Sequence, residues 1–292
     1  MRIRRPTGLS ATIRRMKHGW FIGVAIAAVA ALSVPLAAQW PSHASPKIPK
    51  TSDGNVNFDA PAPRTADGTI DLTGVWENLW FYNGRIGQPP VSPPGEPPQT
   101  TFADVGAGFK GGLPLKPRAA ELLKQRKEQN SKDNPDAHCL PMGLMQFHIH
   151  PQPRRMIQTP DEIVILYEGN AGIREIFTDG RALPKNGDVQ PWWYGYSAGH
   201  WDGDTLVVET TGFRDDGWLD IWGSPLTDQA KLTERFRRLN YGTLRIDVTI
   251  DDPKAYTAPF TVRLNQKIVP GGELIEFICA ENERSTAHMI GR

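Results

Sequence analysis

Segments in which apolar and polar residues alternate fill most of the chain between Arg154 and Ala280, and they constrain the fold most strongly. Such alternation is typical of half-buried β-strands, and Gly, Asp and Pro bound each segment as turn residues. In the clearest segment, residues 243–251, the apolar side chains share one face: Leu244, Ile246, Val248 and Ile250. No helical crossover interrupts the run, so the sequence predicts antiparallel strands throughout.

The run predicts four hairpins, because each of four short turns lies between two such segments. The paired strands are expected at Ile163–Tyr167 with Ile173–Thr178, Ser197–Trp201 with Thr205–Thr211, Lys231–Arg238 with Thr243–Asp251, and Phe260–Val269 with Glu273–Cys279. A further strand, the first in the chain, is expected at Asp71-Leu72-Thr73-Gly74-Val75-Trp76, which Leu79, Trp80 and Phe81 follow. About nine or ten strands can close into a barrel or split into two packed sheets. We favour the barrel, because closure removes exposed strand edges.

The rest of the chain divides into three regions around this barrel. Residues 117–129 begin with Pro and are rich in helix-forming residues, so they predict the one short helix of a mainly β domain at 69–292. Residues 39–68 are polar and proline-rich, and we interpret them as an extended linker or arm. Residues 1–38 combine a basic leader with an apolar run that ends in small residues, which is the pattern of a signal peptide.

Export follows from this leader, so we expect a periplasmic or secreted protein. The alternative is an uncleaved membrane anchor, because the apolar run approaches the length that spans a bilayer; membrane contact is expected only through that segment. In an oxidising compartment the two cysteines, Cys139 and Cys279, are expected to form a disulfide. Two buried free thiols are the alternative, since the sequence does not establish their proximity.

Composition excludes several classes of function. The net charge is +1 and no basic stripe is present, which argues against a nucleic-acid partner. The chain has no Gly-x-Ser-x-Gly motif, no phosphate-binding glycine loop, no dinucleotide fingerprint and no zinc-type Cys/His spacing. We therefore predict no cofactor.

Several segments resemble a large family of exported bacterial proteins, abundant in acidobacteria and proteobacteria, that has no assigned function. They are DLTGVWE, HCLPMG, IQTPDEIVILYEG, REIFTDGR, GYSAGHWDGDTLVVETTGF, LTERFRR, VTIDDPKAYTAPFTV and ELIEFICAENE. The resemblance implies a barrel similar to that of lipocalins and calycins, whose first strand opens with Gly-x-Trp. Many relatives carry histidines where this chain has Ala182-Leu183-Pro184 and Pro225-Leu226-Thr227. An activity that depends on those histidines is not expected here.

Trp218, Asp220 and Trp222 form the first candidate site. Their spacing of two would place the three side chains on one side of an extended segment. A carboxylate between indoles is a plausible acid or base, because apolar neighbours raise its pKa. Further aromatic residues could wall a ligand site with Trp218 and Trp222: Trp76, Trp192, Trp193, Tyr194 and Tyr196. The alternative is an aromatic cap over one barrel end, with Asp220 capping a turn.

Charged residues at strand ends form the second candidate. His200 could act as a general base with Glu168 as its orienting carboxylate, beside Arg174 and Glu175. The alternative is cross-strand ion pairing on a solvated face. A second charged group, Glu234, Arg235, Arg237 and Arg238 opposite Arg245 and Asp247, predicts an exterior ladder. An arginine stacked on Trp76 across the barrel end would fit a lipocalin-like plan.

Met142, Met145, His148 and His150 are the third candidate. On an extended segment, His-x-His would place both imidazoles on one face, and thioethers with imidazoles suit copper. The alternative is a methionine-rich packing segment. Together, the candidates favour an exported barrel that binds or acts on a small apolar or aromatic molecule, as a lyase, isomerase or hydrolase without cofactor. A non-catalytic ligand-binding protein and a copper-binding protein are the alternative functions.

Overall fold

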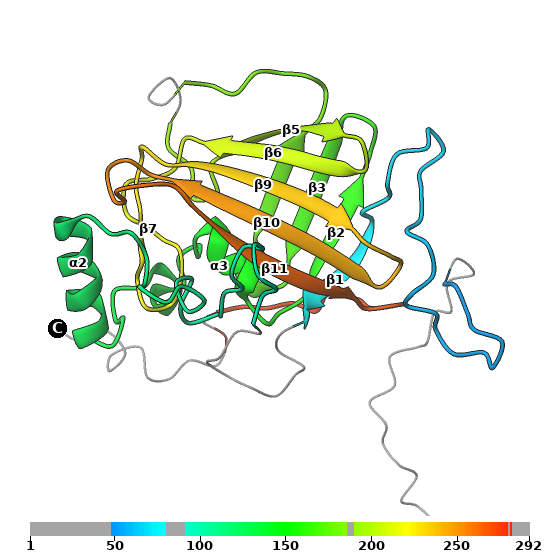
Figure 1. Cartoon of the computed structure of the whole chain (residues 1–292), viewed down its shortest axis with the longest axis horizontal. Coiled ribbons are helices and arrows are strands. Elements are labelled where there is room, and N and C mark those ends of the chain that lie inside the picture. The colour runs from blue at the N-terminus through cyan, green and yellow to red at the C-terminus, as the bar shows by residue number, and fades with distance from the viewer. Residues whose placement is uncertain (1–47, 80–90, 186–189, 280, 282–292) are drawn as a thin grey trace, which may run out of the picture. The chain divides into compact units, whose positions relative to one another are not determined.

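Nine β-strands close into a barrel in the computed structural model of the protein, in the order β1–β11–β10–β9–β6–β5–β4–β3–β2 (Figure 1). The structure describes residues 48–79, 91–185, 190–279 and 281. The barrel strands are β1 (Gly74–Asn78), β2 (Arg154–Gln158), β3 (Glu162–Tyr167), β4 (Ile173–Phe177), β5 (Tyr196–Asp202), β6 (Thr205–Thr211), β9 (Lys231–Arg238), β10 (Thr243–Asp251) and β11 (Phe260–Ile268). A separate two-stranded sheet joins β7 (Gly217–Trp218) to β8 (Pro225–Leu226).

Three of the four predicted hairpins are confirmed, and so is the mainly β, barrel-forming fold class. The strand pairs β3–β4, β5–β6 and β9–β10 are antiparallel, with turns at the expected positions. The alternation in β10 also holds, because its apolar residues all face the barrel interior and are buried. Alternation with turn residues was thus sufficient to locate these strands.

The fourth predicted hairpin is wrong. Residues 273–279 form no strand, and β11 instead pairs with β1, where Trp76 lies opposite Ile268. Because β1 occupies the free edge of β11, barrel closure leaves no edge there for another strand. The segment runs past the β3–β4 turn, where the Ile275 backbone N–H donates a hydrogen bond of 3.1 Å to the Glu168 carboxylate.

The prediction that all strands are antiparallel is wrong for one pair. Strands β4 and β5 are parallel, with Ile176 opposite Ser197. A parallel pair needs a long crossover connection, and residues 178–195 supply it, with no helix in their described part. The expectation rested on consecutive hairpins, and no hairpin was predicted between these two strands.

The predicted helix is present as α2 (Pro117–Glu128), but the chain contains a second α-helix that the sequence analysis missed. This helix, α3 (Leu144–Ile149), lies in the segment interpreted as extended, and all six of its residues are buried. A helix that is buried on every side shows no amphipathic pattern, so periodicity cannot reveal it. Gly143 precedes the helix. Any larger residue would clash there, because its Cβ would lie 2.2 Å from the Trp218 carbonyl oxygen.

Trp76 and Arg238 close one end of the barrel. The Trp76 side chain is fully buried, and its indole N–H donates to the Leu72 carbonyl at 2.9 Å. The Arg238 guanidinium lies 4.8 Å from the centre of that ring and donates to the Tyr241 carbonyl at 2.7 Å. Arg238 is therefore the arginine expected over Trp76, and not a member of an exterior charge ladder.

The described part of the N-terminal arm packs against the β9–β10 turn. Backbone N–H groups of Tyr241 and Gly242 donate to the carbonyls of Ala60 and Phe58, at 2.7 and 2.8 Å. Arg64 forms an ion pair of 2.8 Å with Asp204 in the β5–β6 turn. The predicted signal peptide, residues 1–38, lies outside the described residues. Within the described ranges, none of the helices has the length and apolarity needed to cross a bilayer.

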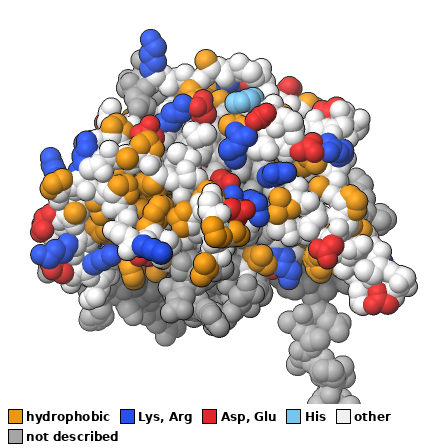
Figure 2. All heavy atoms as spheres, in the orientation of Figure 1, with side chains coloured by type: hydrophobic (Ala, Val, Ile, Leu, Met, Phe, Trp, Pro, Cys, Tyr) orange, Lys and Arg blue, Asp and Glu red, His pale blue; other side chains and the backbone are white. Residues whose placement is uncertain are grey.

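The surface in view carries both signs of charge. Figure 2 shows Lys and Arg side chains interspersed with Asp and Glu, which agrees with the net charge of +1. On this face, the picture gives no support to a single-sign field of the kind that attracts nucleic acid.

The predicted disulfide between Cys139 and Cys279 is confirmed, with a Cα–Cα distance of 5.5 Å. It joins the segment after the 3₁₀ turn η2 (Pro135–His138) to the segment that follows β11. The two cysteines are 140 residues apart, so the bridge closes a long loop and removes much conformational freedom from the unfolded chain.

We predict that replacing both cysteines with serine lowers the free energy of unfolding by about 3–5 kcal/mol, because the unfolded chain regains this freedom. Urea denaturation of the variant and of the wild type, each with and without reductant, measures the effect. Reductant should lower the stability of the wild type alone. Equal stability of the oxidised wild type and the variant would contradict the prediction.

Candidate functional site

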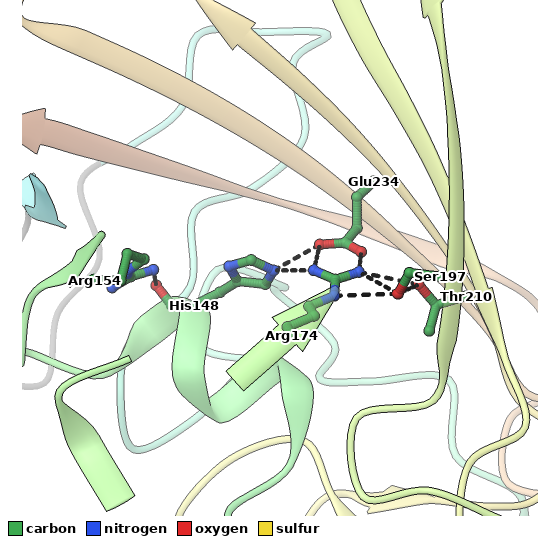
Figure 3. A network of polar contacts seen from close by, with 6 residues as sticks. All are labelled: His148, Arg154, Arg174, Ser197, Thr210 and Glu234. Atoms are coloured by element: carbon green, nitrogen blue, oxygen red, sulfur yellow. Dashed lines mark hydrogen bonds and ion pairs between the residues drawn. The ribbon is translucent and has the colours of Figure 1, made fainter. Parts of the chain in front are cut away.

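Polar side chains from five elements meet inside the barrel, although most of the interior is apolar (Figure 3). We call them the interior cluster: His148 of α3, Arg174 of β4, Ser197 of β5, Thr210 of β6 and Glu234 of β9. Every member is at least 98% buried. Their burial demands partners, because an uncompensated polar group inside a protein costs free energy.

Strand alternation places Glu234 in the interior. Leu232, Glu234 and Phe236 occupy the same face of β9, and the flanking residues across the sheet are Val208 and Val248. The prediction of an exterior position for Glu234 is therefore wrong. The sequence did contain a signal, since Glu234 alternates with two large apolar residues, but the neighbouring arginines dominated the interpretation.

Arg174 and His148 share the Glu234 carboxylate. Arg174 donates from Nη1 to Oε1 at 3.0 Å and from Nη2 to Oε2, and His148 Nε2 lies 2.6 Å from Oε1. The other Arg174 N–H groups donate to the Ser197 and Thr210 hydroxyls at 3.0–3.2 Å. The two-pronged geometry satisfies both oxygens of the carboxylate and fixes the plane of the guanidinium.

The charges of the cluster follow from these contacts. Burial acts to raise the pKa of Glu234, but Arg174 and His148 outweigh it and lower the pKa to about 2. Burial lowers the pKa of His148, so its imidazole is neutral at neutral pH despite the nearby carboxylate. An ionised carboxylate can only accept hydrogen bonds. His148 must therefore donate from Nε2–H, which leaves Nδ1 as an unprotonated nitrogen.

This arrangement resembles that of a positioned base. A carboxylate that holds one imidazole nitrogen fixes the tautomer and leaves the other nitrogen able to accept a proton. The Nδ1 of His148 is buried and has no hydrogen-bond partner among the described residues. The sequence analysis had considered His148 for metal binding and had not placed it beside Arg174 or Glu234, because α3 and the strands are far apart in the chain.

Asp220 lies in a turn between β7 and β8, not on an extended strand. Its carboxylate accepts backbone N–H groups of Val105, Gly223 and Ser224 at 2.8–3.0 Å, and burial raises its pKa. The predicted single face does not form, since Trp218 is buried and Trp222 is 41% exposed. The geometry gives Asp220 a turn-capping role; its catalytic role stays a prediction.

Two of the predicted ligand-binding residues, Trp193 and Trp218, meet in a surface cleft of about 380 Å³. We call it the aromatic cleft, and its lining is Leu122, Gln125, Arg126, Gln129, Asp133, Pro135, His138, Leu140, Trp193, Asp216 and Trp218. Arg126 of α2 lies 4.2 Å above the Trp218 ring and donates to the Gly223 carbonyl at 2.8 Å. Burial lowers the pKa of Arg126 to about 10, so it stays charged at neutral pH.

The other predicted aromatic residues lie outside this cleft. Trp192 and Tyr196 contact each other, with ring centres 5.5 Å apart, and Tyr194 packs edge-on against Phe147 at 5.1 Å. Trp76 is buried under Arg238, as described above. The aromatic residues therefore divide between core packing, the outer surface and one cleft.

Glu168 and His200 do not form a pair. Glu168 follows β3 and accepts the Ile275 backbone N–H, whereas His200 is exposed on β5, and β4 lies between these two strands. Arg174 points inward, but Glu175 points outward on the same strand. The proposed roles of Glu168 and His200 stay predictions, without a shared geometry to support them.

The third candidate segment is helical, so its two imidazoles do not share an extended face. His148 contacts Glu234, whereas His150 ends α3 and packs edge-on against Phe102 at 4.8 Å. Met142 and Met145 are buried in the hydrophobic core. In the part of the chain that the structure describes, no group of three or more His, Cys, Asp or Glu residues is placed to hold a metal ion.

Comparison of the chain with protein-family models, with functionally characterised proteins and with solved structures gave no match.

We predict that Glu234→Gln lowers the free energy of unfolding by about 3–5 kcal/mol, because Arg174 keeps a buried charge without its counterion. Glu209→Gln is the matched control, since Glu209 pairs with Lys231 at the surface and should change stability by less than about 1 kcal/mol. Chemical denaturation of both variants measures the difference. Similar small losses in both would show that the buried pair contributes little.

Acid should lower the free energy of unfolding of the wild type, because Glu234 becomes protonated. The pKa of Glu234 is about 2 in the folded state and 4.5 ordinarily, so its contribution is complete above pH 4.5 and is lost as pH falls toward 2. The contribution of Glu234 to the free energy of unfolding is about 3 kcal/mol. His148, whose folded pKa is lowered, adds a loss in the same direction below its ordinary 6.5. Denaturation experiments between pH 7 and pH 3 should show a smaller loss of unfolding free energy for Glu234→Gln than for the wild type. Equal losses in the two proteins would contradict the prediction.

Proposed function

We propose that the protein binds a small aromatic molecule that carries polar groups, and that the aromatic cleft is its binding site. The observation that carries the proposal is a concave surface that joins two indoles to ionisable and amide side chains. Ligand sites combine apolar walls with a few polar groups that orient the ligand, and their volumes begin near 300 Å³. A cleft of about 380 Å³ suits a molecule of one or two rings.

Two arginines stack on the indole rings that line the cleft. Arg126 covers one face of Trp218, and Arg214 lies 4.4 Å from the centre of the Trp193 ring. Arg214 is in turn paired with Asp216 at 3.2 Å. Such stacking fixes the indoles before a ligand arrives, which reduces the entropy lost on binding.

The polar groups favour a ligand with hydrogen-bonding substituents. Gln125 and Gln129 of α2 can both donate and accept hydrogen bonds. Asp216 is paired with Arg214, so the remaining charges of the lining, on Arg126 and Asp133, balance each other. Balanced charge favours a neutral aromatic molecule over an ionic one. Leu122 and Leu140, both partly exposed, supply apolar contact area.

Binding without turnover is supported better than catalysis at this cleft. The nearest of the predicted catalytic groups, Asp220, is buried and its oxygens already accept three backbone hydrogen bonds. A group that transfers protons must reach the substrate. Cofactor-independent lyase, isomerase or hydrolase activity stays the second candidate, for a substrate bound inside the barrel, because the positioned imidazole of His148 is buried there and does not line the cleft.

We predict that 4-hydroxybenzamide, a neutral phenol with an amide group, binds to the cleft and that Trp193→Ala weakens its affinity at least fivefold, because an aromatic pair contributes about 1 kcal/mol beyond its buried area. Trp192→Ala is the matched control, since Trp192 is the adjacent residue and lies outside the cleft. Isothermal titration calorimetry gives both affinities, and 4-hydroxybenzoate tests the charge preference.

Equal losses of affinity in the two variants, or no binding of 4-hydroxybenzamide, indole or 4-hydroxybenzoate to the wild type, would overturn the proposal. Tighter binding of 4-hydroxybenzoate than of 4-hydroxybenzamide would overturn the preference for a neutral ligand while keeping the site.

A further inference from the structure

Arg154 is a fully buried cation inside the barrel that has no carboxylate partner among the described residues. It belongs to β2 and points inward beside Tyr167 of β3, its cross-strand neighbour. Its Nη1 and Nη2 groups donate to the carbonyls of His148 and His150, at 3.0 and 3.3 Å. Its Nε–H group is buried and has no partner in the described part of the chain.

The Arg154 guanidinium is positively charged at neutral pH. Burial lowers its pKa to about 10, which is still well above the pH of any exported compartment, and only Tyr167 opposes that effect. Glu234, the carboxylate of the interior cluster, is fully engaged by Arg174 and His148. The interior therefore holds two arginines and one carboxylate in these contacts, which leaves one positive charge without a counterion.

A second unpartnered donor belongs to a residue beside Arg154. The Tyr167 hydroxyl is buried close to Arg174 and has no hydrogen-bond partner of normal geometry among the described residues. Buried polar groups are nearly always paired, so two unpaired donors on neighbouring strands beside a buried cation indicate a missing partner. An anion would pair with both donors and also balance the charge of Arg154.

We propose that the barrel interior beside Arg154 is a binding site for a small carboxylate, with the Arg154 Nε–H and the Tyr167 hydroxyl as its donors. A carboxylate provides two acceptor oxygens, which matches two donors on adjacent strands. It also neutralises a charge that would otherwise cost several kcal/mol to keep buried. This site lies inside the barrel and is distinct from the aromatic cleft.

A competing role exists for Arg154. Its two carbonyl acceptors lie at the C-terminal end of α3, where a cation is favourable, so the residue could serve only to hold this helix. The two roles differ in one respect that can be measured. A helix clamp needs no solute, whereas a carboxylate site makes stability depend on the carboxylate concentration.

The test is thermal unfolding of the purified protein in acetate, propionate or benzoate, compared with sodium chloride at equal ionic strength. Samples are equilibrated for hours, because a buried site is reached only through local opening. We expect at least one carboxylate to raise the Tm by about 5–10 °C at a hundred times its Kd. Native mass spectrometry of the same sample should show the bound carboxylate.

Three variants separate the roles. Arg154→Met should abolish the carboxylate effect, and Arg155→Met, the same change on the outward face of β2, should keep it. Tyr167→Phe should weaken carboxylate affinity at least tenfold, because a hydrogen bond to a charged group contributes about 1.5–3 kcal/mol. Without carboxylate it should change the Tm much less than the carboxylate does, since the hydroxyl, although close to Arg174, has no hydrogen bond of normal geometry to lose.

A wild-type Tm that is the same in all carboxylates and in chloride, together with a lower Tm for Arg154→Met, would overturn the proposal and leave Arg154 as a helix clamp. Retention of the carboxylate effect in Arg154→Met or in Tyr167→Phe would also overturn it. Trp193→Ala should leave the effect intact, so failure of this site and failure of the aromatic cleft are distinguishable.

Discussion

The ion pair between Arg174 and Glu234 is the interaction on which the barrel interior depends. Two charges removed from water lose hydration that only a well-shaped partner can replace, and here the carboxylate receives both prongs of the guanidinium and the imidazole of His148. The two hydroxyls of Ser197 and Thr210 take the remaining donors of Arg174. The pair therefore links β4, β5, β6 and β9 to α3 across a largely apolar core.

Helix α3 connects this interior to the surface. Gln146, in the middle of the helix, donates to the Trp218 carbonyl at 3.3 Å and lies 3.5 Å from Asn134, which caps η2. Trp218 and the η2 residues Pro135 and His138 line the aromatic cleft, whereas His148 on the same helix reaches Glu234. The cleft and the interior cluster thus share one short, fully buried element.

The parts of the fold that the sequence predicted are those that depend on local pattern. Strands β9 and β10 have the expected bounds because their turn residues and alternation lie within one short stretch. The pairing of β1 with β11 and the parallel pairing of β4 with β5 were not predicted, because they join segments that no local signal relates. The interior cluster was missed for the same reason: its members were noticed separately, as a metal ligand, a hairpin arginine and a surface glutamate.

The way each buried carboxylate is satisfied decides which groups remain for function. Asp220 is enclosed by three backbone N–H donors, and Glu234 by Arg174 and His148, so neither has a free oxygen to offer a ligand. The buried groups with unmet hydrogen-bonding capacity include Arg154, Tyr167 and the second nitrogen of His148. Arg154 and Tyr167 are donors, and the His148 nitrogen is a neutral acceptor. Within the barrel interior it is therefore His148, and not a buried carboxylate, that keeps an atom able to accept a proton.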